Sequence, residues 1–103
     1  MVSLPGVYQW RNVVNDKRYI GSTSNLRKRL GVHNGGLRTG RNPSVPLQRA
    51  YNKYGPEALV FEPLILCRPE NLVWFEQMLI DQLHPEYNVR PLANSNCGNK
   101  LSP

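Results

Sequence analysis

The chain has 103 residues, of which 40% are hydrophobic and 19% are charged. This length fits one domain, and these proportions are typical of a globular protein rather than of a disordered or membrane-embedded one. No stretch approaches the roughly 20 apolar residues that a membrane span requires, and the first residues lack the basic leader and apolar run of a secretory signal. We therefore expect an intracellular protein, cytoplasmic or organellar, that is neither secreted nor bound to a membrane.

The charge balance predicts a polyanionic partner. Thirteen Lys and Arg against seven Asp and Glu give a formal net charge of +6 and a pI near 9.8. Nucleic acid would suit such a surface, but anionic membranes, acidic proteins or solubility alone would also account for it. The cysteines predict no metal site, because neither Cys67 nor Cys97 has a Cys or His neighbour at zinc-ligand spacing. We expect Cys67 to be a small core residue and Cys97 a free thiol.

A β-hairpin is predicted near the amino terminus. Residues 6–11 and 18–21 are rich in aromatic and β-branched residues, and a polar stretch separates them. If the connecting loop has four residues, Tyr8 lies directly opposite Tyr19. The two phenols would then project from the same face of the sheet.

Two helices are predicted in the middle of the chain. The first is expected over about residues 25–34, ending where Gly35-Gly36 loosen the apolar periodicity. Ser44 can cap the second helix, which Gly55-Pro56 stop.

A strand and a third helix complete the expected elements. Residues 59–67 predict the strand, and Pro63 within it indicates an edge or a bulge. The third helix opens at Pro69-Glu70 and ends before His84-Pro85. This helix is the most apolar part of the chain.

Glu76 is the most informative single residue, because it shares one stripe of the third helix with Leu72, Leu79 and Leu83. A carboxylate on an apolar stripe loses hydration worth several kcal/mol, so it needs a cation, a metal ion or strong donors. Two interpretations stay open, a buried ion pair with an arginine and a metal ligand. Asp81 lies on another side of the helix and is expected to be a solvated charge.

Arg29 and His33 lie four positions apart and project from one face of the first helix. Such a stripe alone is usually a solvated face, although arginine can bind phosphate with two donors. Tyr8 and Tyr19 alone would be half-buried packing residues with wet hydroxyls. The occurrence of all four together with Glu76 favours a functional site.

The two strand segments carry motifs of a known family. Gly6-Val7-Tyr8 is similar to a GIY triplet, with valine in place of isoleucine, and Tyr19-Ile20-Gly21 matches YIG. Residues 47–55 are similar to a helical segment of phage and intron homing endonucleases. Over roughly residues 5–90 the chain therefore resembles the GIY-YIG endonucleases, and in particular the catalytic domain of their phage- and intron-encoded homing members.

The resemblance implies a fold and a domain plan. The fold would be a small α/β (α+β) domain in which about three helices flank a three-stranded, mostly antiparallel sheet, with the site on the face that bears both tyrosines. The nuclease domain would span residues 1–92. Residues 93–103 would be a tail or linker, whose end is similar to the start of a DNA-binding repeat in homing enzymes.

The resemblance also implies a hydrolase, a divalent-metal-dependent endodeoxyribonuclease in which water attacks a phosphodiester bond. The residues that would carry this reaction are Tyr8, Tyr19, Arg29, His33 and Glu76, with Asn88 in support. Glu76 would bind one Mg²⁺ or Mn²⁺ ion, and Arg29 would neutralise a phosphate oxygen. Tyr8 is favoured over His33 as general base.

DNA is the implied partner, and a monomer is favoured. The basic residues expected to contact DNA are Arg27, Lys28, Arg38, Arg41, Arg49 and Lys53. Two alternatives stay open: a stand-alone restriction, repair or structure-specific nuclease with the same site, and a non-catalytic DNA-binding domain. Glu76 argues against the second, because a carboxylate that faces a phosphate without a metal ion is repelled.

Overall fold

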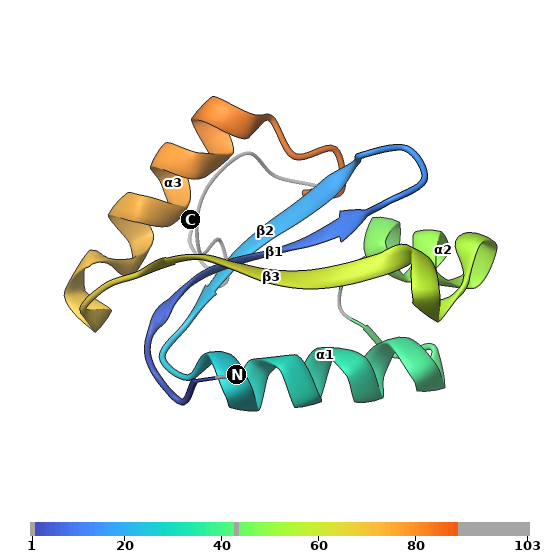
Figure 1. Cartoon of the computed structure of the whole chain (residues 1–103), viewed down its shortest axis with the longest axis horizontal. Helices are drawn as coiled ribbons and strands as arrows, with labels where there is room; N and C mark the ends of the chain where they lie inside the picture. Colours follow the sequence, from blue (N-terminus) through green and yellow to red (C-terminus); the bar gives the residue numbers. More distant parts are fainter. Residues whose placement is uncertain (1, 43, 89–103) are drawn as a thin grey trace.

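Three antiparallel strands form one sheet in the order β2-β1-β3, with β1 in the centre (Figure 1). The computed structural model describes residues 2–42 and 44–88. The strands are β1, Gly6–Asn12, β2, Arg18–Thr23, and β3, Leu59–Leu66. Together with three α-helices, this sheet confirms the expected fold class. Cys97 and the predicted tail lie outside the described residues.

The register of the hairpin differs from the expected one by two residues. Tyr8 pairs with Gly21, and Tyr19 pairs instead with Trp10. Because side chains alternate between the two faces of a strand, a shift of two positions keeps both tyrosines on one face. The expected pairing was therefore wrong, whereas the shared face is confirmed.

The longer turn between β1 and β2 explains this shift. The side-chain oxygen of Asn12 accepts a hydrogen bond from the Val14 N–H at 2.9 Å, and its amide donates to Tyr87 Oη at 3.1 Å. Asp16 adopts a left-handed conformation, with φ of 62°. The bond to Tyr87 holds the turn, and Tyr87 is far from the turn in sequence. Local turn chemistry therefore did not predict the length of the turn.

Helix α1, Leu26–Thr39, continues five residues beyond the predicted end at residue 34. Asn25 caps its start by accepting a hydrogen bond from the Lys28 N–H, and Gly40 ends it in a left-handed conformation with φ of 76°. Leu37 lies in the core at 1% exposure. Burial of Leu37 and the Gly40 cap outweigh the helix penalty of Gly35-Gly36, which is about 1 kcal/mol for each glycine.

Helix α2, Val45–Tyr54, begins and ends where the sequence predicts. The Ser44 side chain accepts a hydrogen bond from the Leu47 N–H, and Gly55 follows the last helical residue. A short 3₁₀ turn, Pro56–Ala58, then leads into β3.

Pro63 lies in an edge strand and also at a bulge. The pairing of β1 with β3 shifts between Val7 and Tyr8, which face Ile65 and Pro63, so that Leu64 is the extra residue. Both features agree with the expectation for a proline within a strand.

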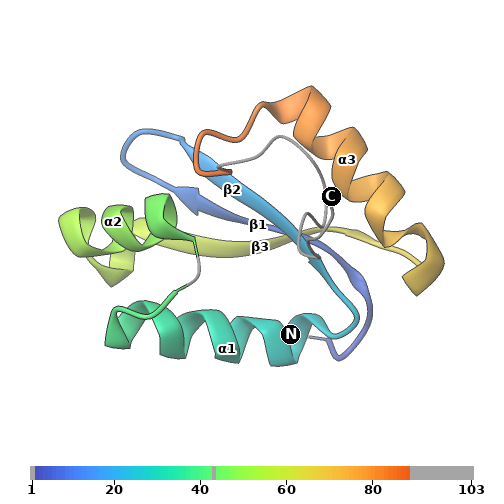
Figure 2. The same cartoon turned by 180° about the vertical axis from the view of Figure 1, so that it is seen from behind.

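The helices cover both faces of the sheet. Helices α1 and α2 pack on one face, and α3, Leu72–Leu83, packs on the other after a 3₁₀ turn at Pro69–Asn71 (Figures 1 and 2). The core on the first face includes Tyr8 and Leu26, and the core on the second includes Val7 and Ile80. Within the described residues, no helix is both long enough and apolar enough to cross a membrane.

Candidate active site

Tyr8, Tyr19 and His33 lie together on the sheet face that α1 covers. Tyr8 is 2% exposed, and its Oη lies 2.9 Å from His33 Nε2. Its ring also stacks on Phe61 with a centroid separation of 4.9 Å. The Tyr19 ring lies 5.9 Å from the His33 ring. The structure thus brings three of the five predicted catalytic residues into one cluster.

Gly21 provides the space for the Tyr8 hydroxyl. A Cβ atom at position 21 would lie 2.5 Å from Tyr8 Oη. The two residues are direct partners across the hairpin, so the phenol lies over the bare backbone of β2. The position of the Tyr8 hydroxyl therefore requires a glycine at the end of the Tyr19-Ile20-Gly21 motif, because any larger residue would clash with it.

The environment keeps both phenols protonated near neutral pH. Burial raises the pKa of Tyr8 far above its ordinary value, Tyr19 raises it further, Arg29 opposes the rise, and Glu76 adds to it. Burial likewise raises the pKa of Tyr19, with Glu76 adding to the rise and Arg29 opposing it. Arg29 and Glu76 are therefore near enough to act on both phenols.

His33 is held in its neutral form. Its side chain is 6% exposed, and burial together with the nearby Arg29 lowers its pKa from 6.5 to about 4. Its second ring nitrogen, Nδ1, lies 2.9 Å from the side-chain amide nitrogen of Asn42. Both nitrogens of the imidazole thus have partners inside the protein.

Glu76 reaches the site from the opposite face of the sheet. It lies on α3, is 6% exposed, and accepts a hydrogen bond from Ser22 Oγ on the edge strand β2. Ser22 is on the same side of β2 as Ile20, whereas Tyr19 points toward α1. Glu76 therefore bonds to β2 from the α3 side of the sheet, whereas the two tyrosines lie on the α1 side.

Arg29 is exposed on α1, beside the cluster. In the part of the chain that the structure describes, it forms no ion pair with a carboxylate. A guanidinium in this setting can bind an external anion with two donors. Arg29 and Glu76 thus offer opposite charges beside the two phenols.

Asn88 supports the site through the backbone of β2. Its side-chain oxygen accepts a hydrogen bond from the Ile20 N–H at 2.8 Å, and its amide donates to the Ile20 carbonyl at 2.9 Å. This pair of bonds fixes the edge strand between Tyr19 and Ser22. The contact is with the strand that carries the site residues and not with their side chains.

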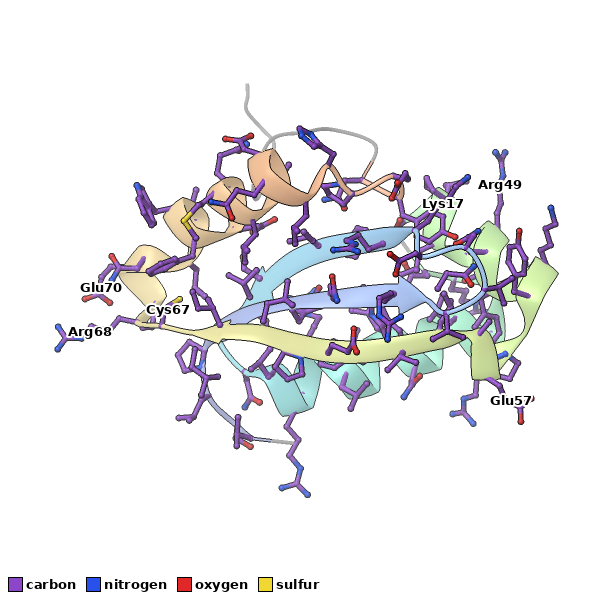
Figure 3. All side chains as sticks on the ribbon, turned by 45° about the horizontal axis from the view of Figure 1, so that its top comes forward. Lys17, Arg49, Glu57, Cys67, Arg68 and Glu70 are labelled. Carbon is purple, nitrogen blue, oxygen red and sulfur yellow. The ribbon has the colours of Figure 1, made fainter. Side chains whose placement is uncertain are left out.

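The basic residues expected to contact DNA are all exposed and belong to α1, α2 and the segment between them: Arg27, Lys28, Arg38, Arg41, Arg49 and Lys53. Figure 3 shows Arg49 extending away from α2, at the end of the molecule opposite Arg68 and Glu70. These six side chains therefore lie on the helical layer that also carries Arg29 and His33.

The donor atoms around Glu76 suit a hard cation. They include its own carboxylate and the hydroxyl of Ser22, and such oxygen ligands are what Mg²⁺ and Mn²⁺ prefer. Among the described residues, no group of three or more His, Cys, Asp and Glu side chains is placed to enclose a metal ion. One protein carboxylate is nevertheless sufficient for Mg²⁺, which keeps several waters and also binds substrate phosphate.

Three residues of the cluster were missed by sequence reasoning. The sequence gives no functional signal for Ser22 or Asn42, and Phe61 is only one apolar residue of the predicted strand at residues 59–67. Asn42 had a detectable turn signal, since Asn-Pro-Ser is a turn sequence in which the asparagine side chain accepts a backbone N–H. It accepts the Ser44 N–H at 2.9 Å. Nothing local indicates that its amide also contacts His33.

Known proteins are similar in sequence to this chain. A family model described as the GIY-YIG catalytic domain matches residues 4–88. Intron-associated endonuclease 1 of Enterobacteria phage T4 is 33% identical over 101 residues, covering 94% of this chain and 40% of the relative. UvrABC system protein C of Mycoplasmopsis agalactiae is 29% identical over 90 residues, covering 82% of this chain and 14% of the relative.

A solved structure extends this likeness to the fold. The catalytic domain of homing endonuclease I-TevI superposes with a TM-score of 0.76 at 30% identity, covering 84% of this chain and 98% of that domain. The chain spans less than half the length of the phage endonuclease and of the UvrABC protein C named above. The matched segment contains the motifs of both strands and the glutamate of α3. The chain therefore belongs to the GIY-YIG family and is a nuclease domain similar to the catalytic domain of a homing endonuclease.

Proposed function

We propose that the chain is a metal-dependent DNA endonuclease that hydrolyses phosphodiester bonds. The observation that carries the proposal is that the buried carboxylate of Glu76 and the exposed Arg29 both act electrostatically on the buried phenol of Tyr8 and on the partly buried phenol of Tyr19. A phosphodiester needs a cation for its charged oxygens and a group that moves a proton from water. This cluster offers both.

Glu76 would hold one Mg²⁺ or Mn²⁺ ion, which supplies Lewis-acid stabilisation of the charged phosphate when bound. Arg29 would bind a non-bridging oxygen whose charge increases as the water oxygen forms its bond to phosphorus and the bond to the leaving oxygen breaks. Tyr19 would help orient the attacking water. Asn88 would keep β2 in place and would not contact the substrate.

Tyr8 is the proposed general base. Its oxygen lies at the centre of the cluster, whereas both nitrogens of His33 are engaged with protein partners. The requirement is demanding, because burial raises the Tyr8 pKa and disfavours the phenolate. A cation near the site would lower that barrier by favouring the charged form.

The DNA strand would lie along the basic layer of α1 and α2. Arginine and lysine contacts to phosphate position a protein without specifying a base sequence. The match to less than half of the phage relative suggests that this chain acts as the catalytic module of a longer homing-type protein, with residues 1–92 as the nuclease domain and residues 93–103 as a linker. One such site acts on one strand per event, and a monomer suffices for that step.

A nicking assay tests the proposal. Supercoiled plasmid is incubated with the purified chain in Mg²⁺, in Mn²⁺ and in chelator, and we expect relaxed circles only when a metal ion is present. Absence of nicking in every metal and salt condition would favour the alternative of a non-catalytic DNA-binding domain.

Two variants test the residue roles. Glu76→Ala and Arg29→Ala should each lower the nicking rate by about 10²–10³-fold while retaining most of the affinity for DNA, since each removes transition-state stabilisation. Asp81→Ala is the matched control, because it removes an exposed carboxylate from the same helix as Glu76. Full activity of Glu76→Ala would exclude its role as the metal ligand.

A further inference from the structure

The imidazole of His33 is bonded at both nitrogens to buried polar groups. Nε2 lies 2.9 Å from Tyr8 Oη, and Nδ1 lies 2.9 Å from Asn42 Nδ2. Tyr8, His33 and Asn42 are 2%, 6% and 7% exposed. In a neutral imidazole one nitrogen carries the proton and the other accepts a hydrogen bond. The hydrogen-bonding partner of each nitrogen therefore determines which nitrogen is protonated.

The orientation of the Asn42 amide is set by bonds of its own. Its side-chain oxygen accepts the Ser44 N–H at 2.9 Å, so the amide nitrogen must face His33. The Asn42 backbone N–H donates to Gln48 Oε1 at 3.1 Å, which anchors the residue against α2. An amide NH₂ group donates and does not accept. Nδ1 of His33 must therefore be the unprotonated nitrogen.

We propose that Asn42 is a positioning residue that keeps the His33 proton on Nε2, so that His33 donates a hydrogen bond to Tyr8 Oη and cannot serve as the general base. The catalytic meaning of this arrangement rests on the proposed nuclease function. The tautomer itself follows from the hydrogen-bond partners alone.

This arrangement is the reverse of the one in serine hydrolases. There a carboxylate accepts the Nδ1 proton, which leaves Nε2 free to take a proton from the nucleophile. Here the Asn42 amide donates a hydrogen bond to the lone pair of Nδ1, and Nε2–H points at the Tyr8 oxygen. When the phenol loses its proton to solvent, this N–H stabilises the phenolate, which can then accept a proton from the attacking water.

Nitrogen NMR of the imidazole tests the tautomer directly. The chain has two histidines, so the ¹⁵N-labelled protein gives two ring systems, and His84→Gln assigns the remaining one to His33. At neutral pH, above the His33 pKa, we expect Nε2 to show the shift of a protonated nitrogen and Nδ1 that of an unprotonated one. A proton on Nδ1 would overturn the proposal. The wild-type spectrum decides this, whether or not any variant of Asn42 folds.

The variant Asn42→Asp tests the causal role. It replaces the donor at Nδ1 by an acceptor of the same size, so we expect the His33 proton to move to Nδ1 and the nicking rate to fall about a hundredfold, the lower range for a positioned proton-transfer group. Asn34→Asp is the matched control, because it adds the same charge at an exposed position next to His33. It should change neither the spectrum nor the rate.

The outcomes separate the two proposals. Movement of the proton in Asn42→Asp with an unchanged nicking rate would overturn the catalytic role of the tautomer. An unmoved proton in a folded Asn42→Asp variant would overturn the control by Asn42. If the wild-type chain nicks no DNA with any metal ion, the proposed function fails, while the imidazole spectrum still confirms or refutes the positioning by Asn42.

Discussion

At Gly21, the absence of a side chain determines where Tyr8 can lie. An added Cβ would stand 2.5 Å from Tyr8 Oη and 2.7 Å from its Cζ, closer than non-bonded atoms approach. Gly21→Ala must therefore displace the phenol from His33. We expect the free energy of unfolding to fall by about 1–3 kcal/mol, the usual range for overpacking, and plasmid nicking to be lost. Chemical denaturation and the nicking assay measure the two effects.

Gly31→Ala is the control for this substitution, because a Cβ at position 31 meets no atom within 4 Å. It should preserve nicking. An active Gly21→Ala variant of normal stability would contradict the placement of the Tyr8 phenol.

His33 makes the stability of the fold depend on pH. Burial and Arg29 lower its pKa to about 4 in the folded chain, against 6.5 for an ordinary histidine. Between these values the unfolded chain binds a proton that the folded chain does not. The free energy of unfolding should therefore decrease as the pH falls through this window, by at most about 3 kcal/mol. Denaturant titrations across the window measure the slope.

His33→Gln should flatten this slope, because the replacement does not titrate. His84→Gln, which changes an exposed histidine, should leave the slope as it is in the wild type. If both variants behave alike, His33 is not the group responsible.

The candidate site was predictable where a residue conflicted with its local pattern. Glu76 on an apolar stripe indicated a special role from the sequence alone, and its 6% exposure confirms the burial. Tyr8, Tyr19, Arg29 and His33 are ordinary residues in their own segments and became significant only through their joint order. Asn42 was not predicted to be near His33, because only the folded connection between α1 and α2 brings its amide to the ring.

At the scale of elements, α1 contains adjacent glycines with different surroundings. A Cβ at position 35 meets no atom within 4 Å, whereas one at position 36 lies 3.3 Å from the Cα of Asn42. Gly35→Ala should therefore raise the free energy of unfolding by about 0.5–1 kcal/mol through helix propensity. Gly36→Ala should gain less, because the new methyl presses on Asn42. Thermal and chemical denaturation of the pair measure the difference, and equal gains would contradict this account.

The helices and strands were predicted best where a local signal acts without help from the rest of the chain. Ser44 caps α2 and Gly55 ends it, and both effects depend only on neighbouring residues. The turn after β1 and the length of α1 depend instead on Asn12 bonding to Tyr87 and on Leu37 reaching the core. These contacts join residues far apart in sequence, so apolar periodicity and turn propensity could not predict them.

For the whole molecule, the basic layer of α1 and α2 predicts how DNA affinity responds to salt. Each phosphate contact adds about 0.9 to the slope of log affinity against log salt for duplex DNA. Arg49→Ala with Lys53→Ala should weaken binding equally for unrelated sequences and reduce the slope by about 1–2. Fluorescence anisotropy at a series of salt concentrations measures both quantities.

Arg68→Ala is the matched control, because Arg68 lies at the opposite end of the molecule from Arg49 (Figure 3). It should leave the slope unchanged. A larger loss in this variant than in the double variant would place the DNA on the other side of the domain.

In an open sheet of three strands, the two outer strands have unpaired backbone N–H and C=O groups along one side. A strand of another chain can pair with these groups, which leads to aggregation. The Asn88 side chain forms hydrogen bonds with both the N–H and the carbonyl of Ile20. At that residue, β2 therefore has no free backbone group with which another strand could pair. On the opposite side, Pro63 has no N–H and lies at the bulge of β3. The residue that fixes the strand bearing Tyr19 thus also blocks intermolecular strand addition, and loss of Asn88 should promote assembly of the protein into larger species as well as disturb the site.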